Sequence, residues 1–124
     1  MKFQPDTPER VSISAYADDW IAVNGVAHHH HLLLDSQGRI ETWQPERLDC
    51  LSEPECRRVL QSPCEMLLLG TGALHRTILP QQWIWFFQRG IGVEAMTTTA
   101  ACRTFNVLAG EGRNVVALLL LPQT

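Results

Sequence analysis

The sequence predicts an α/β domain with a mixed sheet. Between Cys64 and Leu121 the pattern indicates strand, helix, strand, helix and strand, which is the order of a sheet with crossover helices. The first third of the chain instead alternates apolar and polar side chains between turn signals, as antiparallel strands do. With 124 residues, the chain can form one domain that buries about two-thirds of its unfolded surface.

Composition narrows the class of protein. The formal net charge is −3 and the ten Lys and Arg residues are scattered, which argues against a nucleic-acid-binding face. The longest apolar run, Val115–Leu121, is far too short for a transmembrane helix. Residues 1–10 are polar, so they predict a flexible leader rather than a signal peptide, followed by a single domain over residues 11–124. We therefore expect a cytoplasmic protein.

The cysteines indicate reduced thiols. No two of them form a CxxC pair, and their wide spacing is typical neither of a disulfide framework nor of a zinc site. We therefore expect no cofactor and no structural metal. The four cysteines are Cys50, Cys56, Cys64 and Cys102.

The first third predicts an antiparallel meander of four strands. Val11–Tyr16 alternates apolar and polar residues, which is the pattern of a half-buried strand. Asn24-Gly25 is the strongest short hairpin signal, and it follows a second strand. The four predicted strands are Val11–Tyr16, Trp20–Val23, Val26–Leu34 and Arg39–Trp43.

Two helices are predicted on either side of the Met66–Leu69 strand. Ser52 and Glu55 match a capping box, so a short helix should run from Glu53 to about Gln61. The next helix should begin near Pro80, since proline suits a first-turn position, and should end at Gly90.

One aromatic residue of the second helix is a candidate partner-binding anchor. At about 100° per residue, Trp83, Ile84 and Phe87 share one face, whereas Trp85 lies among glutamines and Arg89. Trp85 either folds over a neighbouring loop, as half-buried tryptophans commonly do, or anchors a partner.

The last crossover helix should run from about Thr98 to Ala109, after a strand at Gly92–Met96. Its buried stripe is predicted as Ala101, Phe105, Leu108 and Ala109, and its polar stripe as Thr99, Arg103 and Asn106, with Cys102 at the border. The helix start lies at the carboxyl end of the preceding strand, where open α/β sheets usually place a binding crevice.

Several sequence blocks carry a family resemblance: Asn24-Gly25, Trp43, Leu68–Gly72, Arg89–Met96, Thr99–Leu108 and Glu111–Arg113. Together they resemble the Mth938-like family, which includes a mitochondrial assembly factor of respiratory complex I. The resemblance implies a compact three-layer α/β domain around a mixed sheet, in agreement with the predicted elements. It also implies binding of protein partners during assembly of a membrane complex, and no established chemistry. The histidines at His28–His31 depart from the family pattern.

The loop Gly70-Thr71-Gly72 is a candidate anion site. It follows an apolar strand, and its backbone amides could hold an anion with help from His75 and Arg76. It is not a dinucleotide fingerprint, because His75 occupies the third glycine position, and no GK[ST] follows. The alternative is that the glycines serve only a tight exit from the strand.

Cys102 is the one candidate nucleophile. A helix N-terminus and the adjacent Arg103 could lower the pKa of its thiol, but nucleophilic catalysis also needs a base within reach. The sequence places no histidine beside it, so a packed thiol is the alternative. Arg103 and Asn106 would then fix the Gly70 loop or bind a carboxylate.

The histidine run is predicted to lie on a strand. His28 and His30 would share one face, and His29 and His31 the other. Two imidazoles can bind a transition metal, but a catalytic zinc site needs a third protein ligand, and none is evident. We expect only adventitious metal affinity. Protonation as the pH falls through about 6.5 would loosen the strand.

We therefore expect a non-enzymatic binding or assembly-type protein with a protein partner, present as a monomer or homodimer. The competing hypothesis is a small-molecule or anion-binding domain with weak enzymatic activity at most. Its candidate residues are Gly70, Thr71, Gly72, His75, Arg76, Thr99, Cys102, Arg103 and Asn106.

Overall fold

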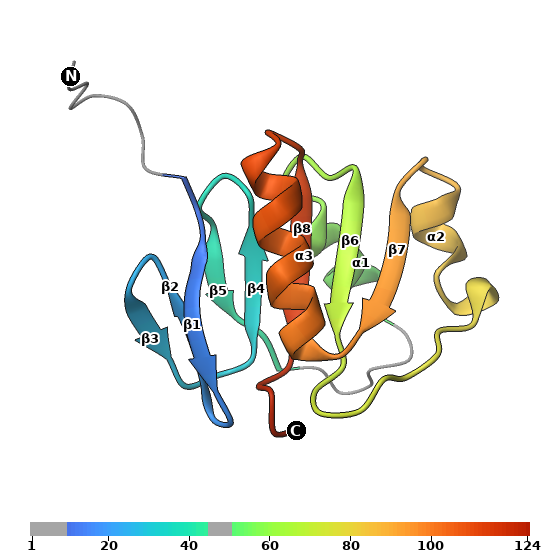
Figure 1. Cartoon of the computed structure of the whole chain (residues 1–124). Helices are drawn as coiled ribbons and strands as arrows, with labels where there is room; N and C mark the ends of the chain where they lie inside the picture. Colours follow the sequence, from blue (N-terminus) through green and yellow to red (C-terminus); the bar gives the residue numbers. More distant parts are fainter. Residues whose placement is uncertain (1–9, 45–50) are drawn as a thin grey trace, which may run out of the picture.

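The computed structural model describes residues 10–44 and 51–124, which form two sheets and several helices (Figure 1). An antiparallel sheet has the order β1-β2-β3, and a mixed sheet has the order β5-β4-β8-β6-β7. The strands are β1 Ile13–Ala17, β2 Trp20–Val23, β3 Val26–His28, β4 Leu32–Asp35, β5 Ile40–Thr42, β6 Met66–Gly70, β7 Gly92–Met96 and β8 Val115–Leu119. The helices are α1 Glu53–Val59, the 3₁₀ helix η1 Pro80–Gln82, α2 Ile84–Phe87 and α3 Thr98–Gly110.

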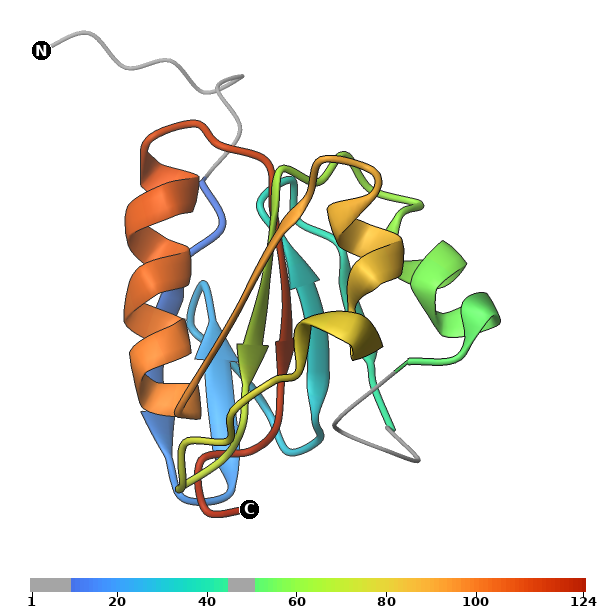
Figure 2. The same ribbon diagram turned by 90° about the vertical axis from the view of Figure 1, so that its right-hand side faces the viewer.

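The mixed sheet forms the middle of three layers. Figure 2 shows α3 on one side of it and α1 with α2 on the other. Strand β8 pairs parallel with β6 and antiparallel with β4, so the sheet joins a βαβ half to an antiparallel hairpin. The predicted α/β fold with a mixed central sheet, antiparallel N-terminal strands and crossover helices is confirmed.

The two faces of the mixed sheet carry separate halves of the core. Alternate side chains of β8 point to opposite faces, and both faces are covered, so the whole strand is apolar. Val115, Ala117 and Leu119 pack with Phe105 of α3 and with the small sheet. On the other face, Val116 and Leu118 pack with Trp83, Phe86 and the buried residues of α1. Each fully buried Leu or Phe side chain contributes about 1.5–3 kcal/mol to folding.

The predicted strand Val26–Leu34 is wrong in one respect: the histidine run interrupts it. Strand β3 ends at His28, and β4 begins at Leu32 in the other sheet. The predicted four-stranded meander is therefore a three-stranded sheet followed by the β4–β5 hairpin. His29 and His30 are exposed in the connection, so alternate histidines do not share a strand face.

The predicted helix from Pro80 to Gly90 is also different. It is divided into η1 and α2, since Trp83 has φ −120° and ψ 12°, outside the α-helical region. The predicted apolar face, which assumed a continuous helix, is therefore wrong at two positions. Trp83 is buried as expected, but Phe86 is its buried partner, and Ile84 and Phe87 are exposed.

Helices α1 and α3 lie where the sequence predicts them. The Ser52 hydroxyl accepts the Glu55 N–H at the start of α1, as the capping box requires. In α3, Ala101 and Phe105 are fully buried as expected, and Cys102 is buried with them rather than at the border. Among the described helices, none is long and apolar enough to cross a membrane. The predicted leader falls almost wholly outside the described residues, as does Cys50.

Candidate functional site

The loop after β6 is held by hydrogen bonds within the chain. Its three successive backbone amides all donate internally: Thr71 N–H to Met96 O (2.8 Å), Gly72 N–H to Thr98 Oγ1 (2.8 Å) and Ala73 N–H to Thr124 O (3.0 Å). The Thr71 hydroxyl donates as well, to Leu74 O at 2.6 Å. An anion at this loop would have to displace one of these bonds, so the geometry favours a structural role for the loop.

Two glycines of the loop are required by close contacts. Gly72 has φ +88°, and a Cβ there would lie 2.3 Å from Thr124 O. A Cβ at Gly70 would lie 2.9 Å from Leu119 Cδ2 and 3.0 Å from Thr98 Oγ1. A larger side chain would displace the loop from Thr98 of α3 at Gly70, or from Thr124 at Gly72, so these glycines serve the tight strand exit that the sequence suggests as the alternative.

The start of α3 also uses most of its backbone donors. Thr98 N–H donates to Gly72 O (3.0 Å), and Ala101 N–H donates to Thr97 O (2.9 Å). The Thr97 hydroxyl accepts the Ala100 N–H at 3.4 Å and caps the helix. Thr99 is half-buried in the same turn. The predicted binding crevice therefore has few free donors at this helix terminus.

Cys102 lies in the core rather than in an accessible site. Only 1% of the residue is exposed, and it belongs to the same core cluster as Phe105 and the small sheet. Burial raises the pKa of its thiol to about 12 despite the adjacent Arg103. Because the thiolate is the nucleophile, a thiol with this pKa is almost entirely protonated near neutral pH. The geometry favours the packed-thiol interpretation.

The prediction that Arg103 and Asn106 fix the Gly70 loop is wrong, because Thr98 makes those contacts. The Asn106 side chain instead bonds both backbone groups of Ile13: its Oδ1 accepts the N–H at 2.8 Å, and its Nδ2 donates to the C=O at 2.9 Å. This pair of bonds joins α3, which packs on the mixed sheet, to β1 of the three-stranded sheet. Arg103 is exposed on the outer side of α3.

His75 and Arg76 lie in the segment between β6 and η1, and both are exposed. The pattern places them just after the Gly70 loop, but its amides are already occupied, so no anion site is formed by the three together. The candidate ligand residues therefore divide into a buried or half-buried structural group, in the Gly70 loop and on α3, and three exposed side chains, His75, Arg76 and Arg103.

Trp85 is half-buried and contacts its own neighbours. Its ring packs edge-on against Phe86, with ring centroids 5.2 Å apart, and the Arg89 guanidinium lies 3.6 Å from the Trp85 ring centroid. Arg89 also donates to the Trp85 carbonyl at 2.8 Å. The indole is thus covered on one face, which agrees with the interpretation that it folds over neighbouring residues.

The segment from the Gly70 loop to α2 exposes four large apolar side chains, and we call the two that lie on α2, Ile84 and Phe87, the α2 apolar surface. Among the described residues, four of the eight exposed large hydrophobic side chains belong to positions 74–87: Leu74 (75% exposed), Leu79 (48%), Ile84 (49%) and Phe87 (36%). Ile84 and Phe87 are one turn apart on α2, so they share a face. Adjacent exposed apolar side chains are candidates for an interaction site, whereas single ones are ordinary, so this pair on α2 is the candidate partner-binding surface.

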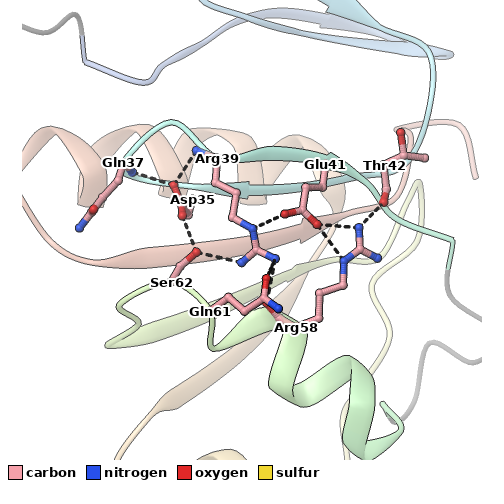
Figure 3. Close-up of polar contacts among 8 residues, drawn as sticks. All are labelled: Asp35, Gln37, Arg39, Glu41, Thr42, Arg58, Gln61 and Ser62. Atoms are coloured by element: carbon pink, nitrogen blue, oxygen red, sulfur yellow. Dashed lines mark hydrogen bonds and ion pairs between the residues drawn. The ribbon is translucent and has the colours of Figure 1, made fainter.

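Figure 3 shows a polar network that the sequence did not predict. It joins α1 and the residues after it to the β4–β5 hairpin, mainly through Arg39. The Arg39 guanidinium donates to Glu41, to Ser62 Oγ (2.9 Å) and to Arg58 O (2.8 Å). Asp35, which is 4% exposed, accepts from the Ser62 hydroxyl at 2.5 Å.

The network has its charges matched. Hydrogen bonds from Arg39 and Arg58 lower the pKa of the Glu41 carboxyl. The second oxygen of Asp35 accepts the backbone N–H groups of Gln37 (2.9 Å) and Arg39 (2.8 Å). Asp35 and Ser62 are buried, and the charged side chains around them are partly exposed but paired, so the role of the network is to fix α1 on the hairpin. Within the described ranges, no group of three or more metal-ligating side chains comes together.

Relatives share both this sequence pattern and this fold. A bovine protein named NADH dehydrogenase [ubiquinone] 1 alpha subcomplex assembly factor 3 is 30% identical over 121 residues, covering 96% of this chain and 65% of the bovine protein. The chain thus spans less than two-thirds of that relative. A crystal structure from Bordetella parapertussis is 35% identical with a TM-score of 0.82, covering 94% of this chain and 99% of that one.

A solution structure from Bordetella pertussis, described as a Mth938-like domain, is 30% identical with a TM-score of 0.76. It covers 99% of this chain and 94% of its own. Residues 13–120 match the profile of the family described as "Protein of unknown function (DUF498/DUF598)". The match extends from β1 to the end of β8, so it includes both sheets, the Gly70 loop and α3. The chain therefore belongs to the DUF498/DUF598 family, and its fold is that of a Mth938-like domain.

Proposed function

We propose that this chain is a non-enzymatic protein-binding domain with an assembly-type role. The observation that carries the proposal is the α2 apolar surface, where Ile84 and Phe87 remain exposed on one short helix. Burying such side chains against a partner contributes about 1.5–3 kcal/mol for each one fully buried. The printed name of the bovine relative, an assembly factor, supports the same role.

The proposal extends to the setting in which the domain works. Because that relative is named for the assembly of NADH dehydrogenase, we infer that the partner belongs to a respiratory or other membrane complex. The domain would act from the cytoplasm, as a monomer or homodimer. A charge of −3 on a chain of 124 residues is compatible with a protein partner and gives no reason to expect nucleic acid.

The alternative, an anion- or small-molecule-binding domain, has less support. The amides of the Gly70 loop donate within the chain, and the thiol of Cys102 is buried. Arg103, His75 and Arg76 remain exposed, so a surface anion site could involve them only without the loop amides. A rise in melting temperature with an anionic metabolite, lost in Arg103→Ala, would favour this alternative.

The test compares capture of partners by three tagged proteins. The wild type, the double variant Ile84→Ser with Phe87→Ser, and the control Val26→Ser are used as baits in host lysate and detergent-solubilised membranes. Val26 is 60% exposed but lies on β3, away from α2. We expect the double variant to lose subunits of one membrane complex by about tenfold or more, and the control to retain them. Equal capture by all three would overturn the proposal.

Trp85→Ala is a less specific test. Its ring packs against Phe86, which is buried in the core, so truncation would also disturb folding. The pair on α2 is the more specific choice, because Ile84 is 49% and Phe87 36% exposed, whereas Trp85 is half-buried against the core residue Phe86. Thermal unfolding of each bait provides the check that the fold is intact.

A further inference from the structure

The five-stranded sheet ends at β7, and the outer edge of this strand has no neighbouring strand within the described residues. In the order β5-β4-β8-β6-β7, β7 pairs only with β6. Figure 2 looks onto this side of the molecule and shows β7 between α3 and α2. The edge of a sheet presents unpaired backbone N–H and C=O groups, which are a template for another strand.

The backbone groups that face outward can be identified. Gly92 N–H donates to Glu65 O (3.1 Å), and Met96 O accepts the Thr71 N–H (2.8 Å), so both ends of β7 face β6. Within a strand, the N–H and C=O of one residue point to the same side, and consecutive residues alternate. Val93 and Ala95 therefore direct their N–H and C=O groups outward, which provides two donors and two acceptors.

The side chains of β7 alternate in the other direction, between the two faces of the sheet. Val93 and Ala95 pack with the core cluster that contains Phe86, on the α2 side. Met96 packs with the α3 cluster, and the Thr104 hydroxyl contacts its sulfur at 3.4 Å. Glu94 lies on the same face as Met96, and it is exposed.

These two alternations define the chemistry of a strand that could add to the edge. We propose that β7 accepts an extended segment of another protein, with Lys or Arg opposite Glu94 and apolar side chains on the α2 side. Opposite charges in cross-strand pairs are favourable, and apolar side chains there would lie next to Val93 and Ala95. The inference rests on the proposed function, because it specifies how the domain would hold part of its protein partner.

The charge of Glu94 also argues against a second copy of this chain as the occupant. In an antiparallel pairing centred on β7, Val93 would pair with Ala95 of the second copy, and the two Glu94 residues would lie directly opposite each other. Their Cα atoms would be about 4.5 Å apart in such a non-hydrogen-bonded pair. Like charges directly opposite are destabilising, so the edge disfavours this pairing and favours a basic partner segment.

The test uses two synthetic eight-residue peptides of alternating valine and threonine, which differ only in a central lysine or glutamate. Amide hydrogen exchange by NMR is measured on the whole domain with each peptide. We expect the lysine peptide to slow exchange at Val93 and Ala95 at least tenfold at saturation, without changing Gly92, which already faces β6. It should also bind at least fivefold more tightly than the glutamate peptide, and Glu94→Lys should reverse this preference.

Ala95→Pro provides the backbone control. Proline removes the outward N–H of Ala95 and leaves the ladder to β6 intact, because Ala95 does not donate to β6. We expect this variant to lose peptide binding at least tenfold, whereas Ala95→Ser keeps it. Unchanged exchange at Val93 and Ala95 with both peptides would overturn the inference, and so would slowed exchange that depends only on the protein concentration, as with a second copy.

The two proposals can fail separately. If the peptides leave β7 unchanged while Ile84→Ser with Phe87→Ser still abolishes capture, only the edge inference is overturned. If the lysine peptide pairs with β7 but the α2 variants capture the same proteins as the wild type, the edge inference stands as a binding property and the proposed role of α2 is overturned.

Discussion

The imidazole Nδ1 of His31 accepts a hydrogen bond from the backbone N–H of Leu121 at 2.9 Å. His31 ends the connection between the two sheets, and Leu121 lies two residues beyond the end of β8. The bond requires the deprotonated Nδ1, since an imidazolium has donors only. It therefore couples the protonation of one histidine to the place where β4 begins beside the end of β8.

This bond predicts a stability that falls in mild acid. Burial, and the neighbouring charge of His30, lower the pKa of His31 in the folded protein. Between that lowered pKa and about 6.5, the unfolded state binds more protons than the folded state, so the free energy of unfolding decreases as the pH falls through this window. Urea unfolding measured between about pH 7.5 and pH 5 would show the decrease.

The control replaces the titratable acceptor with one that does not titrate. Asparagine Oδ1 occupies a position similar to that of imidazole Nδ1, so His31→Asn should keep the bond to Leu121 and flatten the pH dependence in this window. His29 is exposed, and His29→Asn should leave the dependence unchanged. If both variants keep the full slope of the wild type, His31 is not its source.

Features that depend on neighbouring residues in the sequence could be predicted, whereas features that depend on residues far apart in the sequence could not. The capping box at Ser52, the hairpin signal at Asn24-Gly25 and the pattern of β6, β7 and α3 are local, and they gave the correct elements. The interruption of the predicted strand Val26–Leu34 at His29 depends on contacts far apart in the sequence. β3 pairs with β2, whereas β4 pairs with β8, so the two strands belong to different sheets.

The candidate site was harder to predict than the fold for the same reason. Asn106 and Ile13 are 93 positions apart, and no single sequence indicates that they pair. The polar stripe of α3 was identified from periodicity, but periodicity cannot tell a side chain that holds a strand from one that awaits a ligand. The Arg39 network was missed because its members lie on a hairpin, a helix and a turn.

Asn106→Ala should destabilise the domain while leaving its binding surfaces in place. The change removes two hydrogen bonds to Ile13 and leaves partly buried backbone groups without partners, which costs about 1–3 kcal/mol in all. Arg103→Ala, on the exposed side of the same helix, should change stability by less than about 0.5 kcal/mol. Chemical denaturation of both variants measures this difference, and equal losses would contradict the assigned role of Asn106.

Arg39→Ala should be far more damaging than Arg57→Ala, although both residues form ion pairs. The Arg39 side chain is 17% exposed and bonds Glu41, Ser62 and the backbone of α1, so its loss should cost about 1–3 kcal/mol. The side chains of Arg57 and Glu53 are 70% and 63% exposed, and their pair should contribute less than about 0.5 kcal/mol. Urea midpoints at low and high salt separate the two; similar small losses would show that the network is not a stabilising clamp.

Gly72→Ala tests whether the loop after β6 is a structural joint. At φ +88° an alanine is strained, and its Cβ would lie 2.3 Å from Thr124 O, so the loop or the segment after β8 must shift. Strain and displacement together should cost about 2–4 kcal/mol.

The matched control is Gly110→Ala, because a Cβ at this last residue of α3 meets open space. It should be neutral or stabilising by about 0.5–1 kcal/mol, since alanine favours helix. Thermal unfolding of the two variants compares these costs. Equal melting temperatures would show that the loop can rearrange freely, and the anion-binding alternative would then regain the loop amides.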